Sequence, residues 1–258
     1  MEKVVVQGVV VTNFISLSNA SKEAFKTATL LKTLNVNSLI TGEDGVGKKS
    51  LASYILPNAN VVDASDFDAS ITALNSVSQI IITNLHTSPN LNVLLDSIHS
   101  NDVRVIATSK NYLEHEILDD LFSVKFSIPS LSERPEDVRA LIDIFSQEAS
   151  KLFGVETEFN MLNFVPDVSE NSASLKRQVM INYLLQDIKD TELMVIIENY
   201  LSDKLGSNSD YRNFLYLYEV PLIKVGLSKF KSQLKLSDKL GLNRNTLRKK
   251  IADNKKYL

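Results

Sequence analysis

A glycine-rich loop that ends in lysine constrains the fold of this chain more than any other feature. The segment Gly42-Glu43-Asp44-Gly45-Val46-Gly47-Lys48-Lys49 fits the pattern Gly-x-x-x-x-Gly-Lys. The apolar run 38–41 before it predicts a strand, and the pattern of 48–55 after it predicts a helix. In that setting backbone N–H groups can surround a phosphate at the helix N-terminus, while the lysine reaches the outer phosphates. We therefore expect a nucleotide site, which could hold ATP or ADP, built from Gly42, Gly45, Gly47, Lys48 and Lys49.

Short apolar runs separated by helix-length segments indicate a parallel sheet with crossover helices. Such runs occur at 61–62, 79–82 and 103–107, with a β-branched run at 4–11 and an amphipathic helical pattern over 18–34 ahead of them. This alternation favours an α/β fold with helices on both faces of the sheet. After Pro129 the pattern is helical, with a long helix from about Pro135 to Leu152 and further helices between 160 and 201.

Composition excludes several classes of protein. The chain has no cysteine, which excludes disulfides, iron–sulfur clusters, thiolate zinc sites and cysteine nucleophiles. No apolar run reaches the roughly 18–20 residues of a membrane span, and no signal-peptide pattern is present, so we expect a cytoplasmic protein without a membrane partner. The three histidines are not spaced as metal ligands, and we expect no metal site.

The residues needed for nucleotide hydrolysis are harder to find than the loop. Hydrolysis requires a carboxylate at the end of a later strand to hold magnesium. The expected strand 79–82 is followed by Thr83-Asn84, and neither side chain ionises at neutral pH. Lys49 stands where a nucleotide-binding loop usually offers Ser or Thr to the metal. Asp63 is the one acid at another expected strand end, and a turn or helix cap is the favoured explanation for it.

Three segments resemble a known family. The loop segment 42–54 (GEDGVGKKSLASY), 103–109 (VRVIATS) and 128–138 (IPSLSERPEDV) are similar to the AAA+ core of NtrC-type, enhancer-binding bacterial transcription activators. The resemblance runs in order over most of the chain. It implies an AAA+ P-loop-type parallel sheet followed by an all-α lid.

The departures from that family argue against ATPase activity. The Gly-Ala-Phe-Thr-Gly-Ala loop that contacts the alternative sigma factor is absent, Thr83-Asn84 replace the paired acids, and Lys110 stands where a sensor Asn or His is usual. Leu118 occupies the place of the first arginine finger, and 123–125 offer no clear second. Arginine fingers are worth roughly 10³–10⁵ in rate where they operate. Lys176 lies near the second sensor arginine, and its role is left open.

The C-terminal segment differs in charge from the rest of the chain. From Lys224 onward there are eleven Lys or Arg against two Asp, whereas the whole chain has 28 basic and 31 acidic residues. A basic module on an acidic body is the distribution expected when that module alone meets a polyanion.

The same segment has a helix-turn-helix pattern. A short helix ends at Gly241, Leu242 is a turn residue, and Asn243 precedes a second helix in which Leu247 and Ile251 form an apolar stripe. Asn and Arg side chains suit adenine and guanine edges, and Lys suits phosphates. The pattern also resembles the Fis-type DNA-binding module, with only Leu242 changed. The DNA-contacting residues expected on this basis are Asn243, Arg244, Asn245, Thr246, Arg248, Lys249 and Lys250.

We expect four parts: a degenerate AAA+ core (1–134), a helical lid (135–205), a linker (206–212) and a Fis-type helix-turn-helix (213–258). The function expected is that of a nucleoid-associated bacterial regulator that binds double-stranded DNA sequence-specifically as a homodimer, with recognition helices roughly 34 Å apart. It could contact RNA polymerase, requires no cofactor, and is a pseudo-ATPase without catalytic residues. Two alternatives stay open: an ATP-dependent AAA+ remodeller of a protein partner, and a DNA-architectural protein of weak sequence preference.

Overall fold

The computed structural model describes residues 14–111, 116–154, 159, 161, 164–186 and 188–258. The chain divides into two compact units, residues 1–187 and 188–258. The strand expected at 4–11 lies outside the described residues. Among the helices that are described, none is both long enough and apolar enough to cross a membrane.

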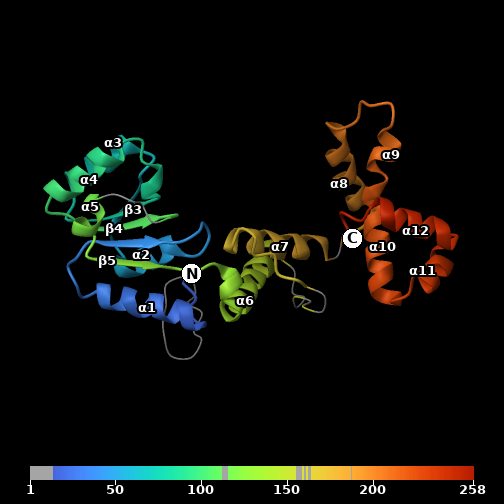
Figure 1. The fold of residues 1–258 in the computed structure, drawn as a ribbon, viewed down its shortest axis with the longest axis horizontal. Coiled ribbons are helices and arrows are strands. Elements are labelled where there is room, and N and C mark those ends of the chain that lie inside the picture. Colours follow the sequence, from blue (N-terminus) through green and yellow to red (C-terminus); the bar gives the residue numbers. More distant parts are fainter. Residues whose placement is uncertain (1–13, 112–115, 155–158, 160, 162–163, 187) are drawn as a thin grey trace. The chain divides into compact units, whose positions relative to one another are not determined.

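The first unit contains a five-stranded sheet in which every strand pair is parallel, in the order β2-β3-β4-β1-β5 (Figure 1). The strands are β1 (Ser38–Thr41), β2 (Asn60–Asp63), β3 (Gln79–Thr83), β4 (Arg104–Ser109) and β5 (Val124–Ser127). Because all strands run the same way, their carboxyl ends share one edge of the sheet, the usual location of ligands in such folds. The predicted parallel sheet is confirmed.

Helices cover both faces of this sheet, as predicted (Figure 1). Successive residues of a strand point to opposite faces, so Ile80 and Ile82 join one buried cluster while Ile81 joins the other. Helices α1 (Asn19–Leu31) and α2 (Lys48–Ile55) pack on the Ile81 face. Helices α3 (Phe67–Leu74), α4 (Leu91–Ser100) and α5 (Glu116–Leu121), with the 3₁₀ turn η1 (Leu85–Thr87), lie on the other.

The remainder of the first unit is a helical pair, α6 (Pro135–Phe153) and α7 (Ser172–Leu185), which follows the 3₁₀ turn η2 (Leu131–Glu133). Proline at its first position and two early carboxylates start α6, and Gly154, at φ +66°, ends it. The two helices share a core that includes Val138, Ile142, Leu175 and Val179. This pair, called the lid below, lies within the range 135–205 that the sequence assigned to a helical lid.

A buried ion pair joins the start of α6 to the glycine-rich loop and to the start of α1. Arg134 and Asp137 are 2% and 0% exposed, with Nη1 and Oδ2 3.5 Å apart. Asp137 Oδ1 accepts the backbone N–H of Leu17 (2.6 Å) and of Ser18 (2.9 Å), and Arg134 Nη2 donates to the carbonyl of Val46 (3.0 Å). The glycine-rich loop, the start of α1 and the lid are therefore held by one pair of charges.

The second unit is entirely helical in its described residues. Its helices are α8 (Asp190–Ser202), α9 (Asp210–Phe214), α10 (Tyr216–Phe230), α11 (Gln233–Leu240) and α12 (Arg244–Asp253). Ile223, Leu236 and Leu247 form its small core. A side chain at Gly226 would collide with Leu236, because a Cβ there would lie 2.3 Å from Leu236 Cδ1.

The division between the units differs from the expected one at 205/206. The contacts group α8 with the C-terminal helices, whereas the sequence placed 190–201 in the lid. The expected linker 206–212 is also partly ordered: Asp210 Oδ2 accepts the N–H groups of Gly206 (2.6 Å) and Ser207 (2.9 Å) and begins α9. An apolar helical pattern predicts a helix but does not show in which unit that helix packs.

Candidate functional site

The glycine-rich loop connects β1 to α2, and its glycines are required by the backbone. Gly42 (φ +143°) and Gly47 (φ +106°) adopt conformations that side chains disfavour. A Cβ at Gly42 would lie 2.5 Å from the carbonyl oxygen of Ile128, and one at Gly47 would lie 2.9 Å from the Phe14 ring. The sequence therefore forms the loop shape that phosphate binding uses.

Lys48 is turned toward the loop and is only 7% exposed. Its Nζ donates to the carbonyl oxygens of Gly42 (2.5 Å) and Glu43 (2.7 Å) and lies 3.6 Å from Asp44 Oδ1. Burial lowers the pKa of Lys48, and the charge of Asp44 partly offsets that effect. The ammonium group of Lys48 therefore lies over the loop, and its neighbours are oxygen atoms of the protein.

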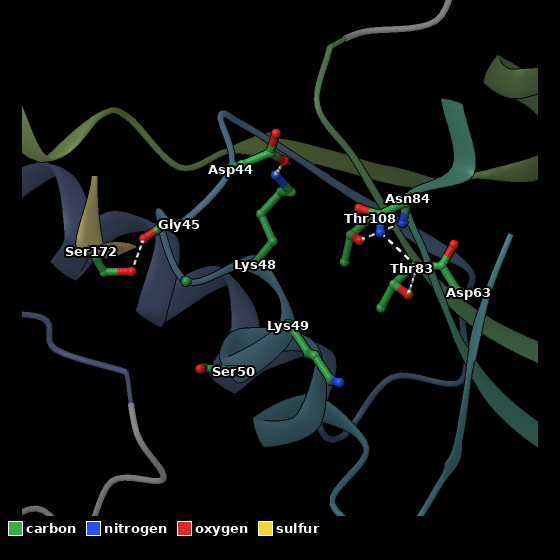
Figure 2. Close-up of a pocket in the computed structure, with 11 residues that line it drawn as sticks. Asp44, Gly45, Lys48, Lys49, Ser50, Asp63, Thr83, Asn84, Thr108 and Ser172 are labelled. Atoms are coloured by element: carbon green, nitrogen blue, oxygen red, sulfur yellow. Dashed lines mark hydrogen bonds and ion pairs between the residues drawn. The ribbon is translucent and has the colours of Figure 1, made fainter. Parts of the chain in front are cut away.

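A cavity of about 310 Å³ opens beside the loop (Figure 2). Polar side chains from the carboxyl ends of β2, β3 and β4 lie across it from Lys48. Its lining residues are Asp44, Gly45, Gly47, Lys48, Lys49, Ser50, Asp63, Thr83, Asn84, Thr108 and Ser172. Of the five residues predicted to bind nucleotide, four line this cavity, and Gly42 contributes its carbonyl to Lys48 instead.

Hydrogen bonds join the polar groups on the far side of the cavity to one another. Asn84 donates from Nδ2 to Asp63 Oδ2 (2.7 Å), and its backbone N–H donates to Thr108 Oγ1 (3.2 Å). Asp63 Oδ1 accepts the N–H (3.0 Å) and the hydroxyl (2.6 Å) of Ser65. Burial acts to raise the pKa of Asp63, but the bonds from Ser65, Asn84 and Thr83 outweigh it and hold that pKa below its ordinary value. Asp63 thus stabilises a turn, as the sequence favoured, and also faces the cavity.

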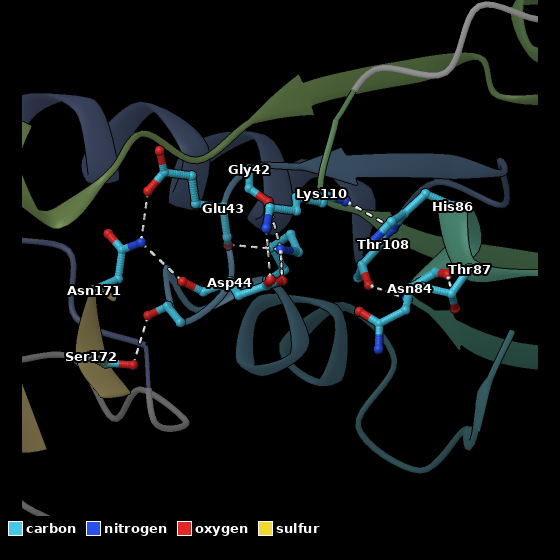
Figure 3. Close-up of polar contacts among 12 residues, drawn as sticks. Gly42, Glu43, Asp44, Asn84, His86, Thr87, Thr108, Lys110, Asn171 and Ser172 are labelled. Atoms are coloured by element: carbon cyan, nitrogen blue, oxygen red, sulfur yellow. Dashed lines mark hydrogen bonds and ion pairs between the residues drawn. The ribbon is translucent and has the colours of Figure 1, made fainter. Parts of the chain in front are cut away.

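Lys110 approaches the loop from the end of β4. Its Nζ lies 3.3 Å from Asp44 Oδ2, so that Asp44 bridges Lys110 and Lys48. Its backbone N–H donates to His86 Nδ1 (3.2 Å; Figure 3). Burial acts to raise the pKa of Asp44, but Lys110 and Lys48 together hold it below its ordinary value. Lys110 therefore directs a cation at the loop.

The lid reaches the loop through Asn171 and Ser172, at the start of α7 (Figure 3). Asn171, 2% exposed and at φ +52°, donates from Nδ2 to Glu43 Oε2 (2.9 Å) and to the Asp44 carbonyl (2.9 Å). The Ser172 hydroxyl donates to the Gly45 carbonyl (2.7 Å). The sequence predicted helices between 160 and 201 but gave no sign that these side chains would meet residues more than a hundred positions earlier.

Other residues considered in the sequence lie away from the cavity. Leu118, which the sequence resemblance set in the place of the first arginine finger, is completely buried in the core. Lys176 pairs with Glu148 (2.7 Å) and Arg177 pairs with Glu170, both within the lid. Neither basic side chain lines the cavity.

The helix-turn-helix pattern corresponds to α11, a turn at Gly241 (φ +63°) and α12. Asn243 Oδ1 accepts the N–H of Asn245 (2.9 Å) and caps α12, while Leu247 is buried. Six of the seven side chains expected to contact DNA are exposed: Asn243, Arg244, Asn245, Thr246, Arg248 and Lys249. The seventh, Lys250, is 28% exposed and pairs with Glu219 of α10. Its charge is thus engaged inside the unit, which sequence spacing could not indicate.

No protein-family model matches the chain, and no curated protein matches it. Among solved structures, NtrX from Brucella abortus in complex with ATP has a TM-score of 0.60 at 17% identity, covering 93% of this chain and 69% of the NtrX chain. Its complex with ADP has a TM-score of 0.61 at 17% identity, covering 94% and 69%. AMPPCP-bound DnaA from Aquifex aeolicus is less similar, with a TM-score of 0.46 at 15% identity over 95% and 90%. The sheet unit and its lid have the AAA+ fold.

Proposed function

We propose that the chain is a sequence-specific, dimeric DNA-binding transcription regulator whose AAA+ unit binds ATP or ADP without hydrolysing it. The observation that carries the DNA-binding part is the exposed polar and basic surface of α12. Arg244, Asn245 and Arg248 are exposed near its N-terminal half, where a recognition helix meets base edges and phosphates. The regulator acts in the nucleoid by occupying DNA or by contacting RNA polymerase.

The packing of α12 supports this role. Leu247 is 1% exposed and packs with Leu236 of α11, so one face of α12 is fixed and the opposite face is free. The cap at Asn243 leaves the amino end of α12 near solvent, and helix amino ends favour phosphate oxygens. These contacts support recognition of DNA by a short helix held on one face.

Lys250 has a different role in this proposal from the one the sequence suggested. Its partner Glu219 is 16% exposed, and the ion pair joins α12 to α10. We assign Lys250 to positioning α12, and Arg248 and Lys249 to DNA contact. Experiment can separate DNA-contacting residues from positioning residues. Loss of a base contact relaxes specificity, and loss of a phosphate contact changes the salt dependence of binding. Loss of a positioning residue changes neither of these directly.

Apolar residues on α8 support a dimer. Helix α8 has no buried residue. Leu193, Met194, Val195, Ile196 and Ile197 are each at least 41% exposed. A helix that is apolar on every side is normally covered. A second copy of the chain would cover it and would supply the second recognition helix for a two-fold site. Ile196→Glu should then yield a monomer by light scattering, and Thr191→Glu, at an exposed position on the opposite side of the same helix, should remain dimeric.

Nucleotide binding without hydrolysis is supported by the loop and by what faces it. The loop glycines and Lys48 have the arrangement that holds phosphates. Across the cavity, Thr83 and Asn84 stand where a hydrolytic site needs a carboxylate. Related folds hold ATP and ADP in NtrX. We expect the chain to bind ADP and to release no more phosphate from ATP than a Lys48→Ala control does. Steady release of phosphate from ATP would instead favour an ATP-driven remodeller.

The DNA-binding proposal is tested with a duplex selected from a random pool by the full chain. Arg248→Ala should cost about 1–3 kcal/mol and relax specificity at one position if Arg248 reads a base, or lower the salt slope by about one if it meets phosphate. Lys250→Ala should leave both specificity and slope unchanged. Equal binding to selected and unrelated duplexes would instead indicate an architectural protein, and an Arg248→Ala variant indistinguishable from the parent would refute the assignment.

A further inference from the structure

The AAA+ fold normally uses a magnesium ion with its nucleotide, but the side chains around this cavity do not suit one. Magnesium requires oxygen ligands, commonly one or two carboxylates, in octahedral geometry. Lys49, at the loop position that would offer a hydroxyl, lines the cavity and brings positive charge. The Thr83 hydroxyl, whose single proton is shared between the Val62 carbonyl (3.1 Å) and Asp63 Oδ2 (3.3 Å), brings no negative charge to the cavity.

The Asp63 carboxylate, across the cavity from Lys48, already accepts hydrogen bonds at both of its oxygen atoms. Asp63 Oδ1 accepts two hydrogen bonds from Ser65, and Oδ2 accepts from Asn84 (2.7 Å) and Thr83 (3.3 Å). Binding a metal would require breaking this network. Among the described residues, moreover, no group of three or more His, Asp or Glu side chains is placed to hold a metal ion.

Positive charge gathers on the loop side of the cavity instead. Lys48 Nζ lies 3.6 Å and Lys110 Nζ 3.3 Å from the same carboxylate, that of Asp44. Asp44 is 69% exposed, so it is anchored chiefly by these two cations. A terminal phosphate carries more charge and more acceptor oxygens than a carboxylate and would compete for the same two donors.

We propose that Asp44 is an internal substitute for a phosphate, and that the phosphates of a nucleoside di- or triphosphate displace it to bind between Lys48 and Lys110 without a divalent cation. This inference rests on the proposed nucleotide binding. Lys110 supplies the charge that a metal supplies elsewhere, and Asp44 swings into solvent. Because Asn171 and Ser172 hold the carbonyls of Asp44 and Gly45, the loop backbone stays in place while the Asp44 side chain moves.

The test measures binding of ADP to the 258-residue chain by calorimetry, in EDTA and in excess Mg²⁺. ADP should bind in EDTA at least as tightly as in Mg²⁺. Lys110→Ala should weaken binding in EDTA by about tenfold or more, the loss expected for one charge-assisted hydrogen bond. Asp44→Asn should tighten it by removing the competing charge. Lys26→Ala, a lysine on the exposed side of α1, is the matched control and should bind like the parent.

Three results would overturn the inference. Binding that requires Mg²⁺ would show a metal-dependent site and would leave the proposed nucleotide binding intact. Unchanged affinity in Lys110→Ala would remove Lys110 from the site. Absence of ADP binding in both buffers would refute the nucleotide-binding proposal together with this inference, and a thermal melt of each variant would show whether it is folded.

Discussion

Replacing Asp137 by alanine should be among the most damaging single changes in the AAA+ unit. Asp137 is completely buried, and it is the partner of Arg134, which is 2% exposed. Removing one member of a buried pair costs about 3–5 kcal/mol, because the other charge is left without compensation. The substitution also leaves the N–H groups of Leu17 and Ser18 without their acceptor. At about 2–4 °C per kcal/mol for a unit of this size, the melting temperature should fall by about 6–20 °C.

The assay is thermal unfolding followed by circular dichroism, with hydrogen exchange on peptides covering 14–31 and 131–153 to assign the transition. Asp143→Ala is the matched control, since Asp143 lies on the same helix and is exposed. Exchange should rise at the start of α1 and α6 in Asp137→Ala and remain at parental levels in the control. A loss below about 1 kcal/mol, in the range of surface substitutions, would refute the argument that this pair holds the lid to the loop.

Three further outcomes are expected. Gly226→Val should destabilise the C-terminal unit by about 1–3 kcal/mol through overpacking against Leu236, seen as faster exchange in α10 and α11, whereas Ser228→Val on the exposed side should not. Because the folded pKa of Asp63 is depressed, its stabilisation is present above its unfolded pKa and is lost as the pH falls through the folded value. Acidification from about pH 5 to about pH 2 should therefore lower the free energy of unfolding of the parent more than that of Asp63→Asn. Parallel curves of unfolding free energy against pH would contradict this. Asn171→Ala should raise exchange in 42–48 and 131–133, and unchanged exchange would exclude the lid contact.

Much of the AAA+ unit could be predicted from sequence because its signals are local. The alternation of residues in 79–82 and 103–107 places successive side chains on opposite faces of a strand, and the structure has them so. The loop glycines mark positive φ angles that other residues avoid. Pro135 fixes the start of the lid helix. These features depend on residues that are close together in the sequence, so one sequence is enough to predict them.

The contacts that complete the site could not be predicted, since they join distant parts of the chain. Asn171 meets Glu43 across 128 positions, and nothing in the residues around it distinguishes it from an ordinary helix start. Lys110 departs from the pattern of the family that the sequence resembles, but its pairing with Asp44 depends on how β4 lies beside β1. Lys250 has the charge expected of a phosphate contact, but it forms an ion pair with Glu219. The boundary after 187 likewise depends on packing.

Capture of fragmented genomic DNA tests whether the chain binds DNA sequence-specifically through α12. The purified chain is incubated with the fragments at physiological salt, and the retained DNA is sequenced alongside that retained by Arg248→Ala. Binding to specific sites should exceed non-specific binding by roughly 10³ or more. A shared, nearly palindromic site should therefore be enriched with the parent chain and lost with the variant. Uniform recovery of the genome, equal for parent and variant, would contradict it.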